Sequence, residues 1–349
     1  MTHHPTRPTS PGRPAIAAGL LLLMALLAAC GGSSDAAGPA DDAGDGSTTT
    51  EAGPWTFTDD IGVTVTLDEA PTTLVTETMV AGGLYEQGID VAGTFGPLTR
   101  SDGTTASEVG LADPDSFTSV GGTTYGEINL EQLAALQPDL IVAPVFEEGT
   151  YWGIDEADTE KVRAIAPIVG IKVGEQRFDK ILESMTELGA ALGADPESEE
   201  VRSHKADFDA SSAALRDALA AKPDLSVVAA SGTPENMYVA VPGGYPDLSY
   251  YETLGMEIVQ PDTDEDYWQT LSWEEADRYP ADLILGDARG GATAEAIVAA
   301  MPESARNLPA IQADQLVPWV LTPALGYGAF SVVIDDLTAA VSAARTDIA

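Results

Sequence analysis

The stretch NLEQLAALQPDLIVAPVF, residues 129–146, decides the fold class of this chain. Its leucines recur at helical spacing as far as Pro138, and an apolar run typical of a buried strand follows. The segment SWEEADRYPADLILGD, residues 272–287, repeats the same order of acidic helix start, proline and strand. Two copies of a helix that leads into a buried strand predict two similar α/β units.

Strand and helix patterns alternate on both sides of these copies. Residues 55–67 alternate apolar and polar side chains about a glycine, which predicts a β-hairpin. Residues 159–171 repeat the pairing of helix and strand. Further strands are expected within residues 73–80, 89–95, 225–231, 237–241 and 316–321, and further helices within residues 81–88, 249–256 and 327–345.

Two long helical segments separate the two halves. Residues 174–194 place apolar side chains at helical spacing over about 30 Å, and a second helix is expected over residues 195–222. We predict an α/β fold of two Rossmann-like lobes with central parallel sheets, joined by one long α-helix, with a ligand cleft between the lobes. The expected limits are an N-terminal lobe at 55–173, a bridging helix at 174–194 and a C-terminal lobe at 195–349.

The N-terminal segment predicts export and a lipid anchor. Arg7 and Arg13 precede an apolar run that is too short for an ordinary membrane span, so residues 1–29 are interpreted as a signal peptide. The sequence LAAC, residues 27–30, resembles a bacterial lipobox, which places cleavage before Cys30 and lipid on its thiol. The alternative is a plain signal peptide with an incidental cysteine. Residues 30–54 are too polar to fold and predict a flexible tether on the extracytoplasmic face of the cell membrane.

Composition limits the function classes. The chain has 56 Asp and Glu against 16 Lys and Arg, a net charge of −40, which argues against nucleic acid and anionic lipid surfaces as partners. A neutral or cationic ligand suits this charge better than a polyanion. After the signal peptide the only histidine is His204, expected on a helix surface, and Cys30 is the only cysteine. These counts argue against zinc sites, Ser-His-Asp triads and Cys-His catalysis.

Several segments, taken in order, resemble one family. Residues 57–75, 129–142, 248–259, 271–285 and 305–319 resemble successive parts of the substrate-binding lipoproteins of ABC importers whose lobes are joined by one rigid helix. Members of that family capture ferric siderophores, haem or cobalamin. Residues 264–277 and 320–330 are most similar to binders of hydroxamate siderophores. The resemblance therefore implies a monomeric capture protein that delivers a ferric siderophore to a permease.

The resemblance also implies the kind of ligand site. The iron of a ferric hydroxamate is already fully ligated, so the protein needs aromatic walls and a few donors, and no cofactor or metal site of its own. The family carries an arginine before the segment NLE, where this chain has Thr123, Thr124 and Tyr125. The candidate ligand-binding residues are Trp268 with the adjacent Tyr267, Tyr327, Tyr151, Trp152, Arg289, Tyr245 and Arg100.

Acidic residues on each lobe are candidates for docking to the permease. Glu127 and Glu131 flank the segment INLE in the N-terminal lobe, and Glu274 and Glu275 hold the corresponding place in the C-terminal lobe. The alternative is that these carboxylates only favour the positive ends of helix dipoles.

Other functions remain open from the residues. Haem or cobalamin could replace the siderophore within the same family, since the tyrosines could serve as axial ligands for haem. A surface-tethered α/β hydrolase could use a carboxylate pair such as Asp264 and Asp266, although no Gly-x-Ser-x-Gly elbow or P-loop is present. A zinc or manganese capture protein is disfavoured by the histidine count.

Overall fold

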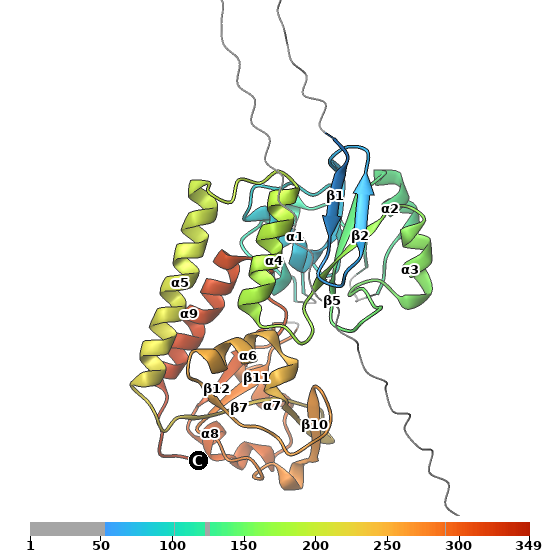
Figure 1. The fold of residues 1–349 in the computed structure, drawn as a ribbon. Helices are drawn as coiled ribbons and strands as arrows, with labels where there is room; N and C mark the ends of the chain where they lie inside the picture. Colours follow the sequence, from blue (N-terminus) through green and yellow to red (C-terminus); the bar gives the residue numbers. More distant parts are fainter. Residues whose placement is uncertain (1–52, 101, 123–125, 290) are drawn as a thin grey trace, which may run out of the picture. The chain divides into compact units, whose positions relative to one another are not determined.

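The computed structural model describes residues 53–100, 102–122, 126–289 and 291–349. Residues Glu51–Ala349 form one compact unit, and its described part contains a two-stranded hairpin sheet and two larger β-sheets, one from each half of the chain (Figure 1). The predicted signal peptide, Cys30, the tether up to residue 52 and Thr123, Thr124 and Tyr125 lie outside the described residues.

The N-terminal sheet is wholly parallel, as predicted. Its strand order is β4-β3-β5-β6, and Leu74 of β3 pairs with Leu140 of β5, while Ile141 pairs with Ile168 of β6. Every residue of β5 is buried, which is typical of a central parallel strand covered on both faces. The elements are the hairpin β1 (Trp55–Thr58) and β2 (Thr64–Leu67), the strands β3 (Leu74–Glu77), β4 (Gly93–Phe95), β5 (Leu140–Val145) and β6 (Ile168–Lys172), and the helices α1 (Thr78–Tyr85), α2 (Leu130–Leu136) and α3 (Glu156–Arg163).

The C-terminal sheet is mixed, which corrects the expectation of a second parallel sheet. Its order is β10-β8-β7-β11-β12, with β9 also paired to β7, and β8 runs antiparallel to both β7 and β10. Only residues 233–235 separate β7 from β8, so the chain can only turn back on itself there. The strands are β7 (Ser226–Gly232), β8 (Asn236–Ala240), β9 (Glu257–Ile258), β10 (Trp268–Ser272), β11 (Leu283–Asp287) and β12 (Leu316–Trp319).

The segment 272–287 forms less helix than the similar segment 129–146. Leu130–Leu136 form α2, capped by Asn129, but residues 273–275 form only a 3₁₀ turn, because β10 continues to Ser272. Trp273 then turns inward, and its Nε1 donates to the carbonyl oxygen of Thr233 at 2.8 Å. The other C-terminal helices are α6 (Pro246–Thr253), α7 (Ala294–Ala300), α8 (Pro309–Gln312) and α9 (Tyr327–Ala343).

Both helices expected between the two halves are present. The helix expected at 174–194 is α4 (Phe178–Ala191), which packs on α1 and β6 on one side and on α6 on the other. The longer helix α5 (Glu199–Ala220) follows and lies alongside α9 (Figure 1). The ring of Phe178 on α4 stacks on that of Phe330 on α9, with centroids 3.7 Å apart, so a single hydrophobic cluster joins both halves.

The segment 322–329, which leads from the loop after β12 into the first turn of α9, is bound tightly to α1. The backbone N–H of Leu325 donates to the carbonyl oxygen of Met79 at 2.9 Å. The Glu86 carboxylate accepts from the N–H groups of Gly328 and Ala329 at 2.7 and 2.8 Å, which caps the start of α9. A Cβ on Gly83 would overlap the Leu325 carbonyl, so this approach requires glycine. In the described part of the chain, no helix is long and apolar enough to cross a membrane.

Candidate ligand cavity between the two sheets

A cavity of about 420 Å³ lies where the carboxyl ends of strands from both sheets meet. This is the position at which open α/β sheets bind ligands. We call it the ligand cavity. Residues that follow β3, β5 and β6 line it on the N-terminal side, and residues that follow β8, β11 and β12 line it on the C-terminal side. Its lining consists of Met79, Phe146, Glu147, Trp152, Val173, Phe178, Tyr245, Pro246, Asp247, Tyr267, Trp268, Arg289, Leu321 and Thr322.

The C-terminal wall is a cluster of aromatic rings in edge-to-face contact. The Tyr245 ring centroid lies 5.2 Å from that of Trp268, 5.9 Å from that of Tyr267 and 4.9 Å from that of Trp319. Trp268 is the first residue of β10, so its backbone is held in the sheet by pairing with Ala240 of β8. Rings fixed in this way give a rigid apolar wall at little cost in side-chain entropy on binding.

The N-terminal wall is mostly apolar and combines aromatic rings with the side chains of Met79 and Val173 and the carboxylate of Glu147. The rings of Phe146 and Trp152 lie 4.8 Å apart, after strand β5. Met79, Val173 and Phe178 complete this side. Such a surface offers shape and buried area to a bulky ligand but few polar anchors.

The charged groups of the cavity belong mainly to the C-terminal side. Asp247 is buried, and its Oδ2 accepts a hydrogen bond from Trp319 Nε1 at 2.5 Å. Burial raises the pKa of the Asp247 carboxyl to about 7, against the opposing effect of the Trp319 hydrogen bond. Arg289 lies at the edge and is paired with Asp287, with 2.7 Å between Nη2 and Oδ2. The remaining charge is Glu147, an exposed carboxylate on the N-terminal side.

Four of the candidate residues line the ligand cavity. They are Trp268, Trp152, Tyr245 and Arg289, with Tyr267 beside Trp268. Trp268 is the first residue of β10. Arg100 is outside the lining, and its side chain lies against Gly291, where a Cβ would overlap it. Arg100 therefore reaches from the N-terminal half to the loop that follows Arg289.

Tyr151 points away from the cavity. Its ring is buried in the N-terminal core, and its hydroxyl lies 3.4 Å from Nη2 of Arg163. Its neighbour Trp152 faces the ligand cavity instead.

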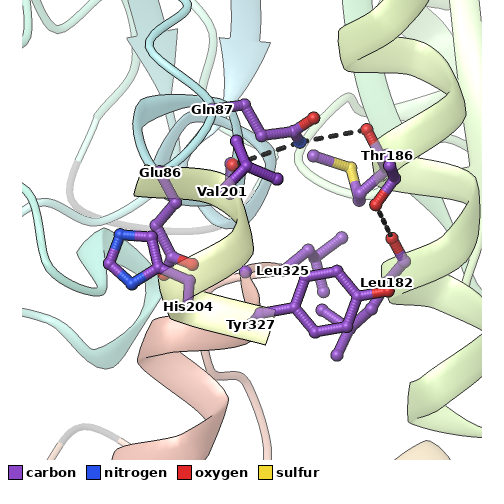
Figure 2. Close-up of a pocket in the computed structure, with 11 residues that line it drawn as sticks. Glu86, Gln87, Leu182, Thr186, Val201, His204, Leu325 and Tyr327 are labelled. Atoms are coloured by element: carbon purple, nitrogen blue, oxygen red, sulfur yellow. Dashed lines mark hydrogen bonds between the residues drawn. The ribbon is translucent and has the colours of Figure 1, made fainter. Parts of the chain in front are cut away.

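Tyr327 lines a different and much smaller cavity, of about 10 Å³ (Figure 2). We call it the α9 cavity. In Figure 2 the Tyr327 ring extends toward Leu182 and Thr186 of α4, while Glu86 and His204 lie together away from it. His204, expected on the surface, is half-buried there, because α5 packs its side chain beside Gly328. The lining of the α9 cavity consists of Gly83, Glu86, Gln87, Leu182, Met185, Thr186, Val201, His204, Leu325, Gly326 and Tyr327.

Sequence reasoning missed several lining residues. Phe146 directly follows the predicted strand at residues 140–145, so its place at the carboxyl end of that strand could have identified it as a lining residue. Asp247 lies two residues after Tyr245, but its burial depends on Trp319, which is distant in the sequence. Met79 and Thr322 carry no local signal of this kind.

The four docking candidates are exposed. Glu131 lies in the first turn of α2, and Glu275 accepts a hydrogen bond from Ser272 Oγ at 3.1 Å. In the described ranges, no group of three or more His, Cys, Asp or Glu residues could hold a metal ion.

Comparison with known proteins supports the same fold. A solved structure of DesE, a ferric-siderophore receptor protein from Streptomyces coelicolor, has 36% sequence identity and a TM-score of 0.78, and the match covers 84% of this chain and 99% of that one. The iron uptake ABC transporter substrate-binding protein PiuA from Streptococcus pneumoniae Canada MDR_19A shares the fold, with 19% identity, a TM-score of 0.63 and coverage of 83% and 100%.

A curated relative matches over a shorter stretch. The Fe(3+)-citrate-binding protein YfmC of Bacillus subtilis (strain 168) is 32% identical over 84 residues, which is 24% of this chain and 24% of that protein. The match therefore spans about a quarter of the relative's length. The family model described as periplasmic binding protein matches residues 70–319. The chain belongs to the periplasmic binding protein family.

Proposed function

We propose that this protein is the solute-binding lipoprotein of an ABC importer, which captures a ferric siderophore outside the membrane and delivers it to the permease. The observation that carries the proposal is the aromatic cavity of about 420 Å³, lined by residues that follow strands of both large sheets and by the start of β10. The similarity to DesE, a ferric-siderophore receptor protein, supports the same ligand class.

A hydroxamate complex suits this cavity best among siderophores. Its iron is already ligated, its outer surface is largely uncharged, and the aromatic wall around Tyr245 and Trp268 offers apolar contact. Haem is a poorer fit, because an axial phenolate would be needed, and burial raises the pKa of the Tyr245 hydroxyl well above its usual range.

Tryptophan fluorescence tests the ligand class. Purified protein would be titrated with ferrioxamine, ferrichrome, ferric enterobactin, ferric citrate, haemin and cobalamin. Trp152 and Trp268 line the cavity, so we expect saturable quenching by the ferric hydroxamates and no turnover of the ligand. A response to haemin or cobalamin alone would overturn the siderophore assignment.

Membrane attachment through Cys30 is part of the same proposal. A Cys30→Ser variant should lose incorporation of labelled fatty acid and leave the cell membrane fraction. Retention of label in that variant would exclude Cys30 as the lipid site.

Permease docking through Glu127, Glu131, Glu274 and Glu275 completes the proposal. Reversal of charge in Glu274→Arg should lower uptake of an iron-loaded siderophore and leave the affinity of the purified protein intact. Glu303→Arg, an exposed change outside the proposed docking set, is the matched control. An equal loss of affinity in Glu274→Arg would contradict the docking role.

A further inference from the structure

The ligand cavity holds more negative than positive charge. Glu147 and Asp247 line it, and Arg289 is the cation among the lining residues that the structure describes. The Arg289 guanidinium is already bound to Asp287: Nη2 lies 2.7 Å from Oδ2, and Nε lies 3.1 and 3.0 Å from the two oxygens. An anionic ligand would have to share this guanidinium with Asp287. The attraction between Arg289 and such a ligand would therefore be much reduced.

These charges gather around the ring that a ligand would contact. Burial is the main cause that raises the pKa of the Tyr245 hydroxyl; Arg289 opposes the rise, and Asp287 and Asp247 add to it. Three charged side chains therefore act on one phenol. Two of the three are carboxylates, and the cavity wall beside Tyr245 is a poor environment for added negative charge.

We propose that the ligand cavity selects ferric complexes without net negative charge, and that Glu147 and Asp247 favour a ligand with a positively charged pendant group. This inference rests on the proposed function and narrows its ligand class. The match to YfmC alone would suggest an anionic ligand such as ferric citrate. The proposed charge selection argues against a ligand of that kind.

The surroundings of Asp247 allow its charge to change with pH. It lies in the first turn of α6 and meets β12 through the neutral indole of Trp319. The other titratable groups around it are Tyr245 before α6, Tyr251 one turn along α6, and the Arg289–Asp287 pair after β11. Because the pKa of Asp247 is raised to about 7, its carboxylate charge increases between pH 6 and pH 8.

A charge series on one ferric core provides the test. Ferrioxamine B, a linear ferric trihydroxamate with a pendant amine, would be compared with its N-acetyl and N-succinyl derivatives by calorimetry. The three complexes carry a positive, a neutral and a negative pendant group on the same core. We expect the amine form to bind about three- to tenfold more tightly than the acetyl form, and the succinyl form to bind most weakly.

Variants and pH identify the responsible groups. Glu147→Gln and Asp247→Asn should each reduce the ratio of amine to acetyl affinity, and Glu147→Gln is an exposed change that does not disturb folding. Glu148→Gln, an exposed neighbour outside the lining, is the matched control and should keep the ratio. The ratio should rise from pH 6 to pH 8, and Asp247→Asn should flatten that rise.

The outcomes separate the two proposals. If neither the series nor any other ferric siderophore of the fluorescence panel binds, the proposed function fails. If the series does not bind but ferrichrome does, the siderophore function stands and the preference for a positive pendant group is wrong. If all three bind with equal affinity, or the succinyl form binds most tightly, the siderophore function stands and the charge selection is wrong. An unchanged ratio in both Glu147→Gln and Asp247→Asn would also overturn the assignment to these carboxylates.

Discussion

The ligand cavity and the α9 cavity differ in what forms them. The first, of about 420 Å³, lies at strand ends and is walled by aromatic rings. The second, of about 10 Å³, has room for about one water molecule and lies where α1, α4, α5 and the start of α9 pack. Each holds an aromatic residue that the sequence marks as a ligand contact, Trp268 or Tyr327. We infer that position relative to the strand ends, rather than residue type, distinguishes a ligand contact from a packing contact.

The glycines beside Tyr327 have a different role in the structure from the one that their sequence pattern predicts. Gly326 and Gly328 flank Tyr327, a pattern that predicts close approach of backbone to a ligand. In the structure, a Cβ at Gly326 would overlap the Glu86 carboxylate, and one at Gly328 would meet the His204 ring. These glycines therefore permit α9 to pack against α1 and α5, and the α9 cavity has a structural role.

The largest expected effect is a loss of stability when the contact between Gly83 and Leu325 in the α9 cavity is disturbed. Gly83→Ala places a methyl group on the Leu325 carbonyl, which is backbone and cannot move aside cheaply. We expect a loss of more than about 3 kcal/mol in the free energy of unfolding, measured by urea denaturation. Gly243→Ala, where a Cβ meets nothing within 4 Å, is the control and should change stability by less than about 0.5 kcal/mol. A small effect of Gly83→Ala would mean that this contact is not tightly packed.

The next effect is on ligand affinity. Trp268→Ala removes one face of the ligand cavity, and we expect a ferric hydroxamate to bind about 30-fold more weakly by calorimetry. Tyr327→Ala should leave that affinity unchanged and lower the melting temperature instead. The reverse result, a loss of affinity in Tyr327→Ala alone, would mean that the two cavities have been assigned the wrong roles.

A smaller effect is the pH dependence of stability. Burial raises the pKa of Asp247 to about 7 in the folded protein, above its ordinary value of 3.8. Its contribution to stability is therefore fully present below about pH 4 and is lost as pH rises through 7. Between pH 6 and pH 8 we expect this group to lower the free energy of unfolding by about 1 kcal/mol.

Asp247→Asn should remove that part of the slope, as followed by urea denaturation at each pH. Glu77 and Glu86 also have pKa values raised by burial, and both are unchanged in the variant, so the comparison isolates Asp247. An unchanged slope in Asp247→Asn would show that this carboxyl titrates alike in the folded and unfolded chain.

The smallest effect is the loss of the Tyr327 hydroxyl. Tyr327→Phe keeps the ring that packs edge-on against Phe208, with centroids 5.4 Å apart. We expect a change in the free energy of unfolding of about 1 kcal/mol or less and no change in ligand affinity. A loss of affinity as large as that of Trp268→Ala would place the ligand in the α9 cavity.

The sequence predicts the order of elements better than the detail of either cavity. The buried run at residues 140–145 is β5, because a continuous apolar stretch after a proline has few other solutions. The prediction for residues 272–287 was wrong in detail. The acidic start resembles that of α2, but β10 extends to Ser272 and only a 3₁₀ turn follows at residues 273–275. Local pattern cannot show that pairing with β8 takes precedence over helix propensity.

The sequence predicts those lining residues of the ligand cavity that follow strands. It does not predict those whose position depends on long-range packing. Trp152 and Arg289 follow strands that the pattern reveals, and both line the ligand cavity. Tyr151 precedes Trp152 directly, yet it points into the N-terminal core, and the sequence carries no sign of that reversal. The burial of Asp247 depends on Trp319, which is 72 residues away along the chain.

The most direct test of the account is the position of the iron in a crystal of the protein with a ferric hydroxamate. Anomalous scattering from iron locates it without reference to the protein structure. We predict one iron site in the ligand cavity, between Trp152 on the N-terminal side and Tyr245 and Trp268 on the C-terminal side. An iron site elsewhere on the molecule, with this cavity filled only by water, would contradict the central claim.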